Sequence, residues 1–260
     1  MPPRRRALVG FALLGFVLAL SVLAACESVP ITGRSQLNLI SEGDEVAMGA
    51  QAYKEVVGKA KVSGDSVANA QVTRVAQRII AVSERPSLPW EVKVIDDKQA
   101  NAFALPGGKI AVYTGILPIT KDDAGLAAVV GHEVGHVLAR HSAERVSQQM
   151  VAQGLGGALV SGVLGTDPQT SQQVAGLFAQ GLLLPWGRKQ ESEADHIGLI
   201  LMAKAGYDPR AARDLWVRMA AASKDSSRPP EFLSTHPSEE TRIRQIEEWL
   251  PEAQKYYKPR

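Results

Sequence analysis

Apolar residues follow two different spacings along this chain. Four segments repeat them at helical spacing: 42–57, 66–82, 122–141 and 191–205. Three segments between the second and third of these alternate apolar and polar residues: 90–95, 101–104 and 109–114. Turn residues at Asp96-Asp97 and Pro106-Gly107-Gly108 separate them, which predicts a small antiparallel sheet. The pattern therefore predicts an α+β fold that is mainly helical, with the sheet beside the helix over 122–141.

The N-terminal segment has the pattern of an export signal. Three Arg at 4–6 precede a run without charge over 7–23, and Leu23-Ala24-Ala25 leads into Cys26. This ending resembles the lipobox of bacterial lipoproteins, in which the cysteine is acylated and the preceding peptide is removed. We expect a signal peptide over 1–25, a lipid anchor on Cys26 and a lipidated tether over 26–40. The alternative is an uncleaved anchor helix, for which the apolar run is slightly short.

The residue after the cysteine bears on the compartment. Glu27 stands where an inner-membrane retention signal usually has Asp. We therefore expect a periplasmic protein that is anchored to the outer membrane of a diderm bacterium.

The composition is that of an ordinary globular protein. There are 29 Lys and Arg against 27 Asp and Glu, so the net charge is only +2, and aromatic residues make up 5%. Nucleic acid is therefore not an expected partner. Cys26 is the only cysteine, which excludes an internal disulfide framework and a zinc site built from thiolates.

The predicted helix over 122–141 carries the clearest chemical motif, His132-Glu133-Val134-Gly135-His136. Residues four apart on a helix share a face, so the two imidazoles can bind one zinc ion. Glu133 lies beside that face, where a carboxylate acts as the base that takes a proton from water. Gly131 and Gly135 each cost about 1 kcal/mol in a helix relative to Ala, which indicates that another element approaches closely there.

The third zinc ligand decides the class of zinc site. A metzincin needs Gly at 139 and His at 142, but the chain has Ala139 and Ser142, which excludes that class. His141 lies about 180° around a continuous helix from His132 and cannot reach the same metal. We therefore interpret His141 as a surface histidine or as a partner of a ligand.

A second acidic helix supplies a better ligand. Glu191 and Asp195 are four residues apart and share a helix face, so Glu191 is the expected third ligand. Asp195 is then placed to accept the spare ring N–H of a ligating histidine. Glu193 is expected to be a solvated helix charge, and His196 is not expected to be a ligand.

Four motifs in one order resemble the HtpX and CAAX-prenyl-protease-like family of zinc metallopeptidases. They are 132–141, 101–108, 191–195 and Ser234-Thr235-His236-Pro237. The chain is most similar to the periplasmic lipoprotein branch that includes the β-barrel assembly-enhancing protease BepA. The resemblance implies a zincin-type metallopeptidase domain over 41–250 with one Zn²⁺ per chain and a C-terminal tail over 251–260. The transmembrane bundle of the CAAX proteases and the tetratricopeptide domain of BepA have no counterpart.

The resemblance also implies roles that spacing does not show. His236 is expected to take the fourth zinc position and hold the enzyme latent, and Arg242 is expected to face the site and stabilise an oxyanion. The implied activity is an endopeptidase that cleaves unfolded or misassembled outer-membrane proteins, with the outer-membrane assembly machinery as a further partner. The alternative is a zinc-containing periplasmic chaperone that binds barrel strands without cutting them.

Two features of the predicted site stay open. The strand over 109–114 is the candidate edge on which an extended polypeptide adds. Asn101 and the 106–108 turn shape that edge or are simple hairpin residues. The glycine-rich segment 146–187 favours two short helices that cover the site, the alternative being a hairpin that dips into a membrane.

Overall fold

A computed structural model describes residues 26–153, 176, 186–224, 231–236 and 240–259. The expected signal peptide lies outside the described residues, as does most of the segment 146–187. Among the residues that are described, no helix is both long and apolar enough to cross a membrane.

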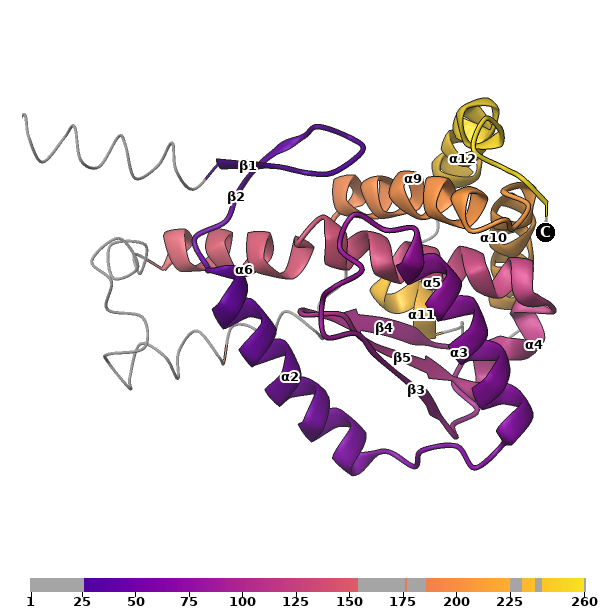
Figure 1. Ribbon diagram of the computed structural model, residues 1–260, viewed down its shortest axis with the longest axis horizontal. Coiled ribbons are helices and arrows are strands. Elements are labelled where there is room, and N and C mark those ends of the chain that lie inside the picture. Colours follow the sequence, from indigo (N-terminus) through magenta and orange to yellow (C-terminus); the bar gives the residue numbers. More distant parts are fainter. Residues whose placement is uncertain (1–25, 154–175, 177–185, 225–230, 237–239, 260) are drawn as a thin grey trace, which may run out of the picture.

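A three-stranded sheet forms one layer of the fold (Figure 1). Its strands are β3 (Glu91–Ile95), β4 (Ala102–Leu105) and β5 (Lys109–Tyr113), in the order β3-β5-β4. β4 and β5 are antiparallel, but β3 and β5 are parallel, so the sheet is mixed and the prediction of an antiparallel sheet is wrong in this detail. Gly107 and Gly108 have φ of 74° and 80° and close a tight β4–β5 hairpin, whereas the longer 96–101 connection carries the chain past β5.

This strand order corrects the expected substrate edge. β5 contains most of the predicted edge strand 109–114, yet it lies in the centre of the sheet and is paired on both sides. In the described part of the sheet, the edge that faces the helices of the site is β4.

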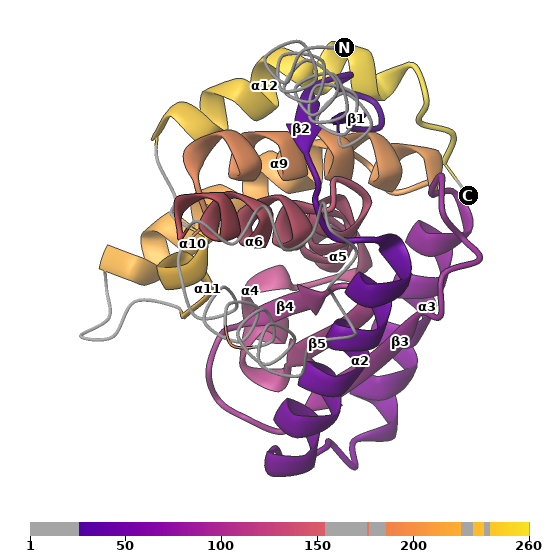
Figure 2. The ribbon, with the colours of Figure 1, turned by 90° about the vertical axis from the view of Figure 1, so that its left-hand side faces the viewer.

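Helices stack over the sheet in layers. Their bounds are α2 (Glu42–Lys59), α3 (Ser66–Ala81), α4 (Leu117–Thr120), α5 (Asp123–Leu138), α6 (His141–Ala152), α9 (Arg188–Lys204), α10 (Arg210–Lys224), α11 (Glu231–Thr235) and α12 (Glu240–Gln254), with a 3-10 turn η1 over Thr114–Ile116. Figures 1 and 2 show the order sheet, α5, α9 and α12, with α3 packed on both β3 and α5. The described part of the chain is thus mainly helical with small sheets, which confirms the α+β prediction.

Helix α5 lies at the centre of the core. Asp122 caps its N-terminus by accepting a hydrogen bond from the amide of Gly125 (2.8 Å). Nearly every residue of α5 after Asp123 and Ala124 is buried, including Val130 and Val134. A helix that is covered on all sides needs no polar face, which explains why its sequence is apolar all round.

Glycines bring α5 and α9 unusually close. A Cβ on Gly135 would lie 2.7 Å from the carbonyl oxygen of Ala194, and one on Gly198 would lie 2.7 Å from the amide nitrogen of His132. Both distances are too short for a side chain, so the close approach expected at Gly131 and Gly135 is confirmed. Through this contact the metal-binding motif of α5 faces the acidic start of α9.

The helix predicted over 122–141 is in fact two helices. α5 ends at Leu138, and Arg140 adopts the left-handed conformation (φ 52°, ψ 36°) before α6 begins at His141. The buried guanidinium of Arg140 binds Glu45 (2.6 Å), Glu27 (2.6 Å) and the carbonyl oxygen of Ile40 (2.8 Å). Tertiary contacts therefore support a backbone conformation that local sequence disfavours.

Residues 26–37 pack on the domain as a hairpin, although a tether was expected there. β1 (Cys26–Ser28) pairs antiparallel with β2 (Ser35–Leu37), and Arg34 binds Glu144 of α6 (2.6 Å) and Glu193 of α9 (2.8 Å). The C-terminal boundary also differs from the expected one, because α12 runs past residue 250 to Gln254.

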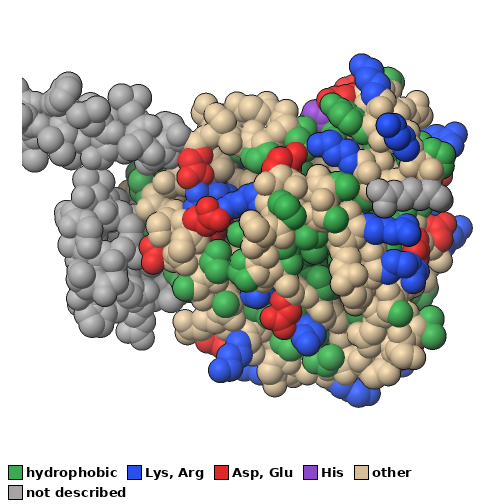
Figure 3. Space-filling model, in the orientation of Figure 1, with side chains coloured by type: hydrophobic (Ala, Val, Ile, Leu, Met, Phe, Trp, Pro, Cys, Tyr) green, Lys and Arg blue, Asp and Glu red, His purple; other side chains and the backbone are tan. Residues whose placement is uncertain are grey.

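The surface carries both signs of charge. On the face drawn in Figure 3, acidic and basic side chains are interspersed around apolar ones. This matches the small net charge of +2.

Candidate metal centre

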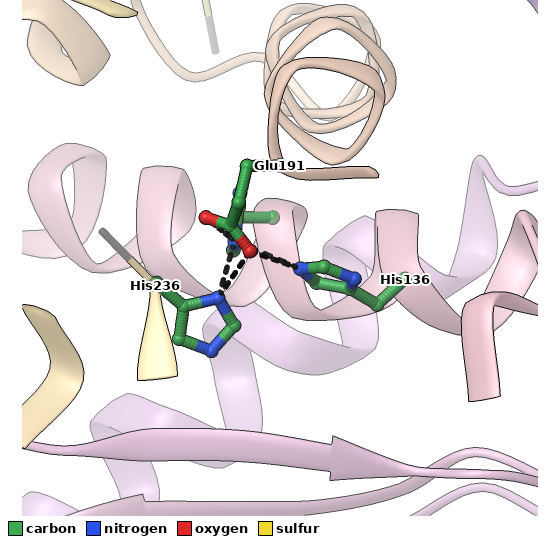
Figure 4. Close-up of side chains that lie close together, drawn as sticks. His136, Glu191 and His236 are labelled. Carbon is green, nitrogen blue, oxygen red and sulfur yellow. Dashed lines mark hydrogen bonds and ion pairs between the residues drawn. The ribbon is translucent and has the colours of Figure 1, made fainter. Parts of the chain in front are cut away.

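Three elements bring the chemical groups together. α5 supplies His132, Glu133 and His136, α9 supplies Glu191 from its first turn, and His236 directly follows α11. All five side chains are buried, with exposures of 1–4%. One ligand atom from each of the three histidines and Glu191 lies within 4.8 Å of the others. Figure 4 shows Glu191 between His136 and His236.

The spacing of these atoms fits a tetrahedral zinc ion. His132 Nε2 lies 3.1 Å from His136 Nε2 and 3.0 Å from His236 Nδ1. Glu191 Oε1 lies 2.9 Å from His236 Nδ1 and 3.3 Å from His136 Nε2. Ligands about 2.0–2.1 Å from Zn²⁺ in a tetrahedron are separated by about 3.3 Å, so these four groups can hold one ion with only small movements.

Hydrogen bonds on the far sides of the rings support the same conclusion. His132 Nδ1 lies 2.9 Å from Asp195 Oδ1, and a carboxylate accepts, so this nitrogen carries the proton. His136 Nδ1 lies 2.8 Å from His141 Nδ1, and His141 Nε2 lies 3.0 Å from Glu193. Both Nε2 atoms therefore present lone pairs to each other at 3.1 Å, an arrangement that a cation between them stabilises.

Burial and charge set the protonation of the ligands. Burial lowers the pKa of His132 and lowers that of His136 further, so both rings are neutral, which is the form that binds metal. Burial alone would raise the pKa of Glu191, but the charge of Arg242 and the neighbouring histidines outweigh it and hold that pKa well below its usual value. The cluster thus offers two neutral nitrogens and one carboxylate.

Glu133 differs from the other carboxylates of the site. Its Oε1 atom is buried and has no hydrogen-bond partner among the described residues. Burial raises the pKa of Glu133 to about 7, against the opposing charge of His236. A carboxyl group with a pKa near neutrality and an oxygen without a hydrogen-bond partner is suited to take and return protons.

His236 lies between the ligand cluster and Glu133. Its Nδ1 lies 2.9 Å from Glu191 Oε1, and its Nε2 lies 3.4 Å from Glu133 Oε1. Burial opposes protonation, but the carboxylates of Glu191 and Glu133 outweigh it and raise the pKa of His236. The ring also stacks on Phe232, with centroids 4.5 Å apart. Its position matches the fourth-ligand position that the resemblance implied.

Arg242 is buried against the carboxylates of Glu191 and Asp195. Its guanidinium, on α12, binds Glu191 Oε2 (2.6 Å) and both oxygens of Asp195, and it stacks 3.6 Å from the ring centroid of Trp216. These contacts hold the two carboxylates of α9 in place. The predicted oxyanion role of Arg242 stays a prediction.

Sequence reasoning missed a second buried group. Glu193, expected to be solvated, is only 6% exposed and accepts hydrogen bonds from Thr32, Arg34 and His141. The prediction failed because it placed the 26–40 segment away from the domain. His196 lies outside the metal cluster, where it pairs with Glu252 (2.8 Å).

A cavity of about 250 Å³ opens beside Glu133. Its lining includes Val56, Asn101, Phe103, Leu105, Trp186 and Thr235. The carbonyl of Asn101 accepts from the amide of Tyr113 (3.0 Å), so the alternation along β4 turns the main-chain groups of Ala104 away from β5 and toward this side. The outer edge of β4 at Ala104 and the base candidate Glu133 therefore border one cavity, and the Ala104 main chain bonds to Glu133.

Comparison with known proteins identifies the family. Residues 66–250 match peptidase family M48. This chain belongs to that family. The M48 chain is 47% identical over 231 residues to the mitochondrial metalloendopeptidase OMA1 of Schizosaccharomyces pombe, covering 88% of this chain and 67% of that protein. It is 33% identical over 250 residues to the OMA1 of Saccharomyces cerevisiae, covering 89% and 71%. The β-barrel assembly-enhancing protease of Escherichia coli is 29% identical over 226 residues, covering 84% and 46%.

These matches confirm the enzyme class. The M48 chain is a zinc metallopeptidase, and its buried cluster of three histidines and one glutamate fits one zinc ion. The predicted resemblance to a family of zinc metallopeptidases is thereby confirmed. The fission-yeast OMA1 is more similar to this chain than the E. coli protein of the branch that the sequence suggested.

Proposed function

We propose that this M48 peptidase is an endopeptidase that cleaves unfolded or misassembled proteins of the bacterial envelope. One observation carries the catalytic part of the proposal. It is the buried cluster of His132, His136 and Glu191, with a Glu133 oxygen beside it that has no hydrogen-bond partner among the described residues. A chaperone that only binds polypeptides has no use for a buried base next to a metal site, so this arrangement favours hydrolysis.

Each residue of the site has a separate role in the proposed hydrolysis of a peptide bond. His132, His136 and Glu191 would hold the zinc ion, which when bound lowers the pKa of water and polarises the scissile carbonyl. Glu133 takes a proton from the attacking water through Oε1 and returns it to the leaving amine. Asp195 accepts a hydrogen bond from Nδ1–H of His132 and so keeps Nε2 directed at the metal position.

The edge of β4 is the proposed substrate-binding element. Ala102 is fully buried, and the amide of Ala104 bonds to Glu133, but Ala104 lines the cavity. We propose that an extended polypeptide pairs with the outward carbonyl of Ala104, which would place its backbone beside Glu133. Main-chain pairing reads little of the sequence, so a wide range of unfolded chains qualifies as substrate. Folded proteins do not qualify, because their strands are already paired.

The first residues of the chain support the proposed location of the enzyme. Arg4-Arg5-Arg6, the apolar run and Leu23-Ala24-Ala25-Cys26 support a lipoprotein that is anchored through Cys26 to the outer membrane. The name of the E. coli relative, a β-barrel assembly-enhancing protease, supports substrates among outer-membrane proteins. The outer-membrane assembly machinery is the proposed partner.

Hydrolysis of one β-barrel protein in two states tests this function. We expect the purified enzyme to cleave the urea-unfolded barrel after dilution, and to leave the same barrel intact when it is folded in detergent. A zinc chelator should stop cleavage, and added Zn²⁺ should restore it. Binding of the unfolded barrel without cleavage would contradict the proposal and favour the chaperone.

The position of His236 leads to a separate prediction. Its ring lies between the ligand cluster and Glu133 and lines the cavity proposed for the substrate. We propose that His236 is a latency switch, so His236→Ala should hydrolyse casein faster than wild type. His196→Ala is the matched control, because His196 also pairs with a glutamate but lies outside the cluster. Unchanged hydrolysis by the His236 variant would remove the switch.

A further inference from the structure

A chain of hydrogen bonds leads away from the expected ligand His136. Nδ1 of His136 lies 2.8 Å from Nδ1 of His141, and Nε2 of His141 lies 3.0 Å from Oε2 of Glu193. His141 is fully buried, and Glu193 is 6% exposed. These hydrogen bonds therefore lie in the protein interior, away from solvent that could take the place of one of the side chains.

The carboxylate at the end of this chain of hydrogen bonds decides which ring nitrogen of each histidine carries the proton. The Glu193 carboxylate only accepts, so His141 Nε2 carries a proton and donates it. The two Nδ1 atoms are 2.8 Å apart, so one of them donates to the other, and Nε2 of His136 faces the ligand cluster, 3.1 Å from His132 Nε2. Nδ1 of His136 is therefore the donor and Nδ1 of His141 the acceptor, which leaves His136 Nε2 with its lone pair directed into the cluster.

The N-terminal hairpin holds the far end. Glu193 accepts from Arg34 Nε (2.8 Å) and from the hydroxyl of Thr32. Together with His141, these contacts surround the Glu193 carboxylate with three donors, one of them the Arg34 cation. The carboxylate is thus a fixed, charged anchor.

We propose that His141 and Glu193 are positioning residues that orient His136 and set its tautomer for zinc binding. His132 has a direct carboxylate partner in Asp195, whereas His136 reaches its carboxylate through the imidazole of His141. Mutation of a residue that hydrogen-bonds to a metal ligand in this way typically lowers metal affinity 10–100-fold. This inference rests on the proposed metal centre and extends it to two residues outside the ligand set.

Two conservative changes at one position separate positioning from packing. The amide of His141→Asn can replace Nδ1 and still accept from His136, whereas the longer His141→Gln replaces Nε2 and keeps only the contact with Glu193. We expect His141→Gln to lose about 10–100-fold in Zn²⁺ affinity and His141→Asn to lose clearly less. The measurement is competition for Zn²⁺ between the metal-free protein and a chromophoric chelator. Equal losses in the two variants would contradict the inference.

Glu193 offers a second test with a matched control. Glu193 and Glu144 both bind Arg34, but only Glu193 also binds His141. Glu193→Gln should weaken Zn²⁺ binding, while Glu144→Gln should leave it close to wild type, with thermal unfolding of each metal-free variant recorded alongside. Equal affinities for the two variants would overturn the inference even if the histidine variants fail to fold.

His132→Ala separates this inference from the metal centre itself. If His132→Ala loses Zn²⁺ but His141→Gln and Glu193→Gln bind it like wild type, the positioning role is wrong and the metal centre stands. If His132→Ala binds Zn²⁺ as tightly as wild type, the metal centre is wrong, and the inference falls with it.

Discussion

Glu133→Gln will slow peptide hydrolysis by about 10²- to 10⁴-fold and leave zinc binding intact. The amide has nearly the shape of the carboxylate, so packing around this buried side chain is preserved. What disappears is the group that accepts a proton from water, because an amide cannot act as a base near neutral pH. The rate of casein hydrolysis and the zinc content of both proteins measure the two parts of this prediction.

The control for this change is the same substitution at an exposed glutamate outside the site. Glu55 lies exposed on α2 and outside the site, so Glu55→Gln should hydrolyse casein at the wild-type rate. If Glu133→Gln retains wild-type activity, the assignment of the base is wrong and the case for a peptidase acting at this site is lost.

Arg242→Ala will destabilise the metal-free protein by about 3–5 kcal/mol. Arg242 is 4% exposed, and its guanidinium binds the carboxylates of Glu191 and Asp195. Its removal leaves two buried negative charges without their cation and also removes the stacking on Trp216. Denaturant-induced unfolding of the metal-free protein measures the loss, because bound zinc would mask part of it.

A surface arginine provides the comparison for this loss. Arg213 pairs with Glu247, and both side chains are largely exposed, so Arg213→Ala should hardly change the midpoint of unfolding. Similar midpoints for the Arg213 and Arg242 variants would show that the buried ion network contributes nothing to stability.

Local spacing was enough to predict the ligands that come from helices. Residues four apart share a helix face wherever the helix is continuous, and this rule paired His132 with His136 and Glu191 with Asp195. The glycines of α5 likewise predicted a close contact with another helix, because glycine destabilises a helix and such a contact is a reason to keep it there. His236 follows α11 and Arg242 lies on α12, so helical spacing relates neither of them to the motif of α5, and only the family resemblance pointed to them.

Tertiary contacts account for what the spacing missed. The left-handed conformation of Arg140 depends on Glu27 and Glu45, which are about a hundred residues away in sequence. Once that turn breaks the helix, His141 comes back to His136 instead of pointing to the opposite side. A His five residues after the end of the motif was the only local signal of this contact.

The predictions of the strand order and of the 26–40 segment failed for a related reason. Alternation predicts strands but does not say which strand lies between which, so β5 was taken for an edge. Strands β1 and β2 have three residues each, too few for a pattern to show. Their packing depends on the ion pairs of Arg34 with Glu144 and Glu193.

Anomalous diffraction at the zinc edge, from crystals of the zinc-loaded enzyme, tests the central claim most directly. The account predicts one strong peak per chain, within bonding distance of His132 Nε2, His136 Nε2 and a carboxylate oxygen of Glu191. A zinc peak bound by other residues, or an active crystal form with no zinc at these side chains, would contradict it.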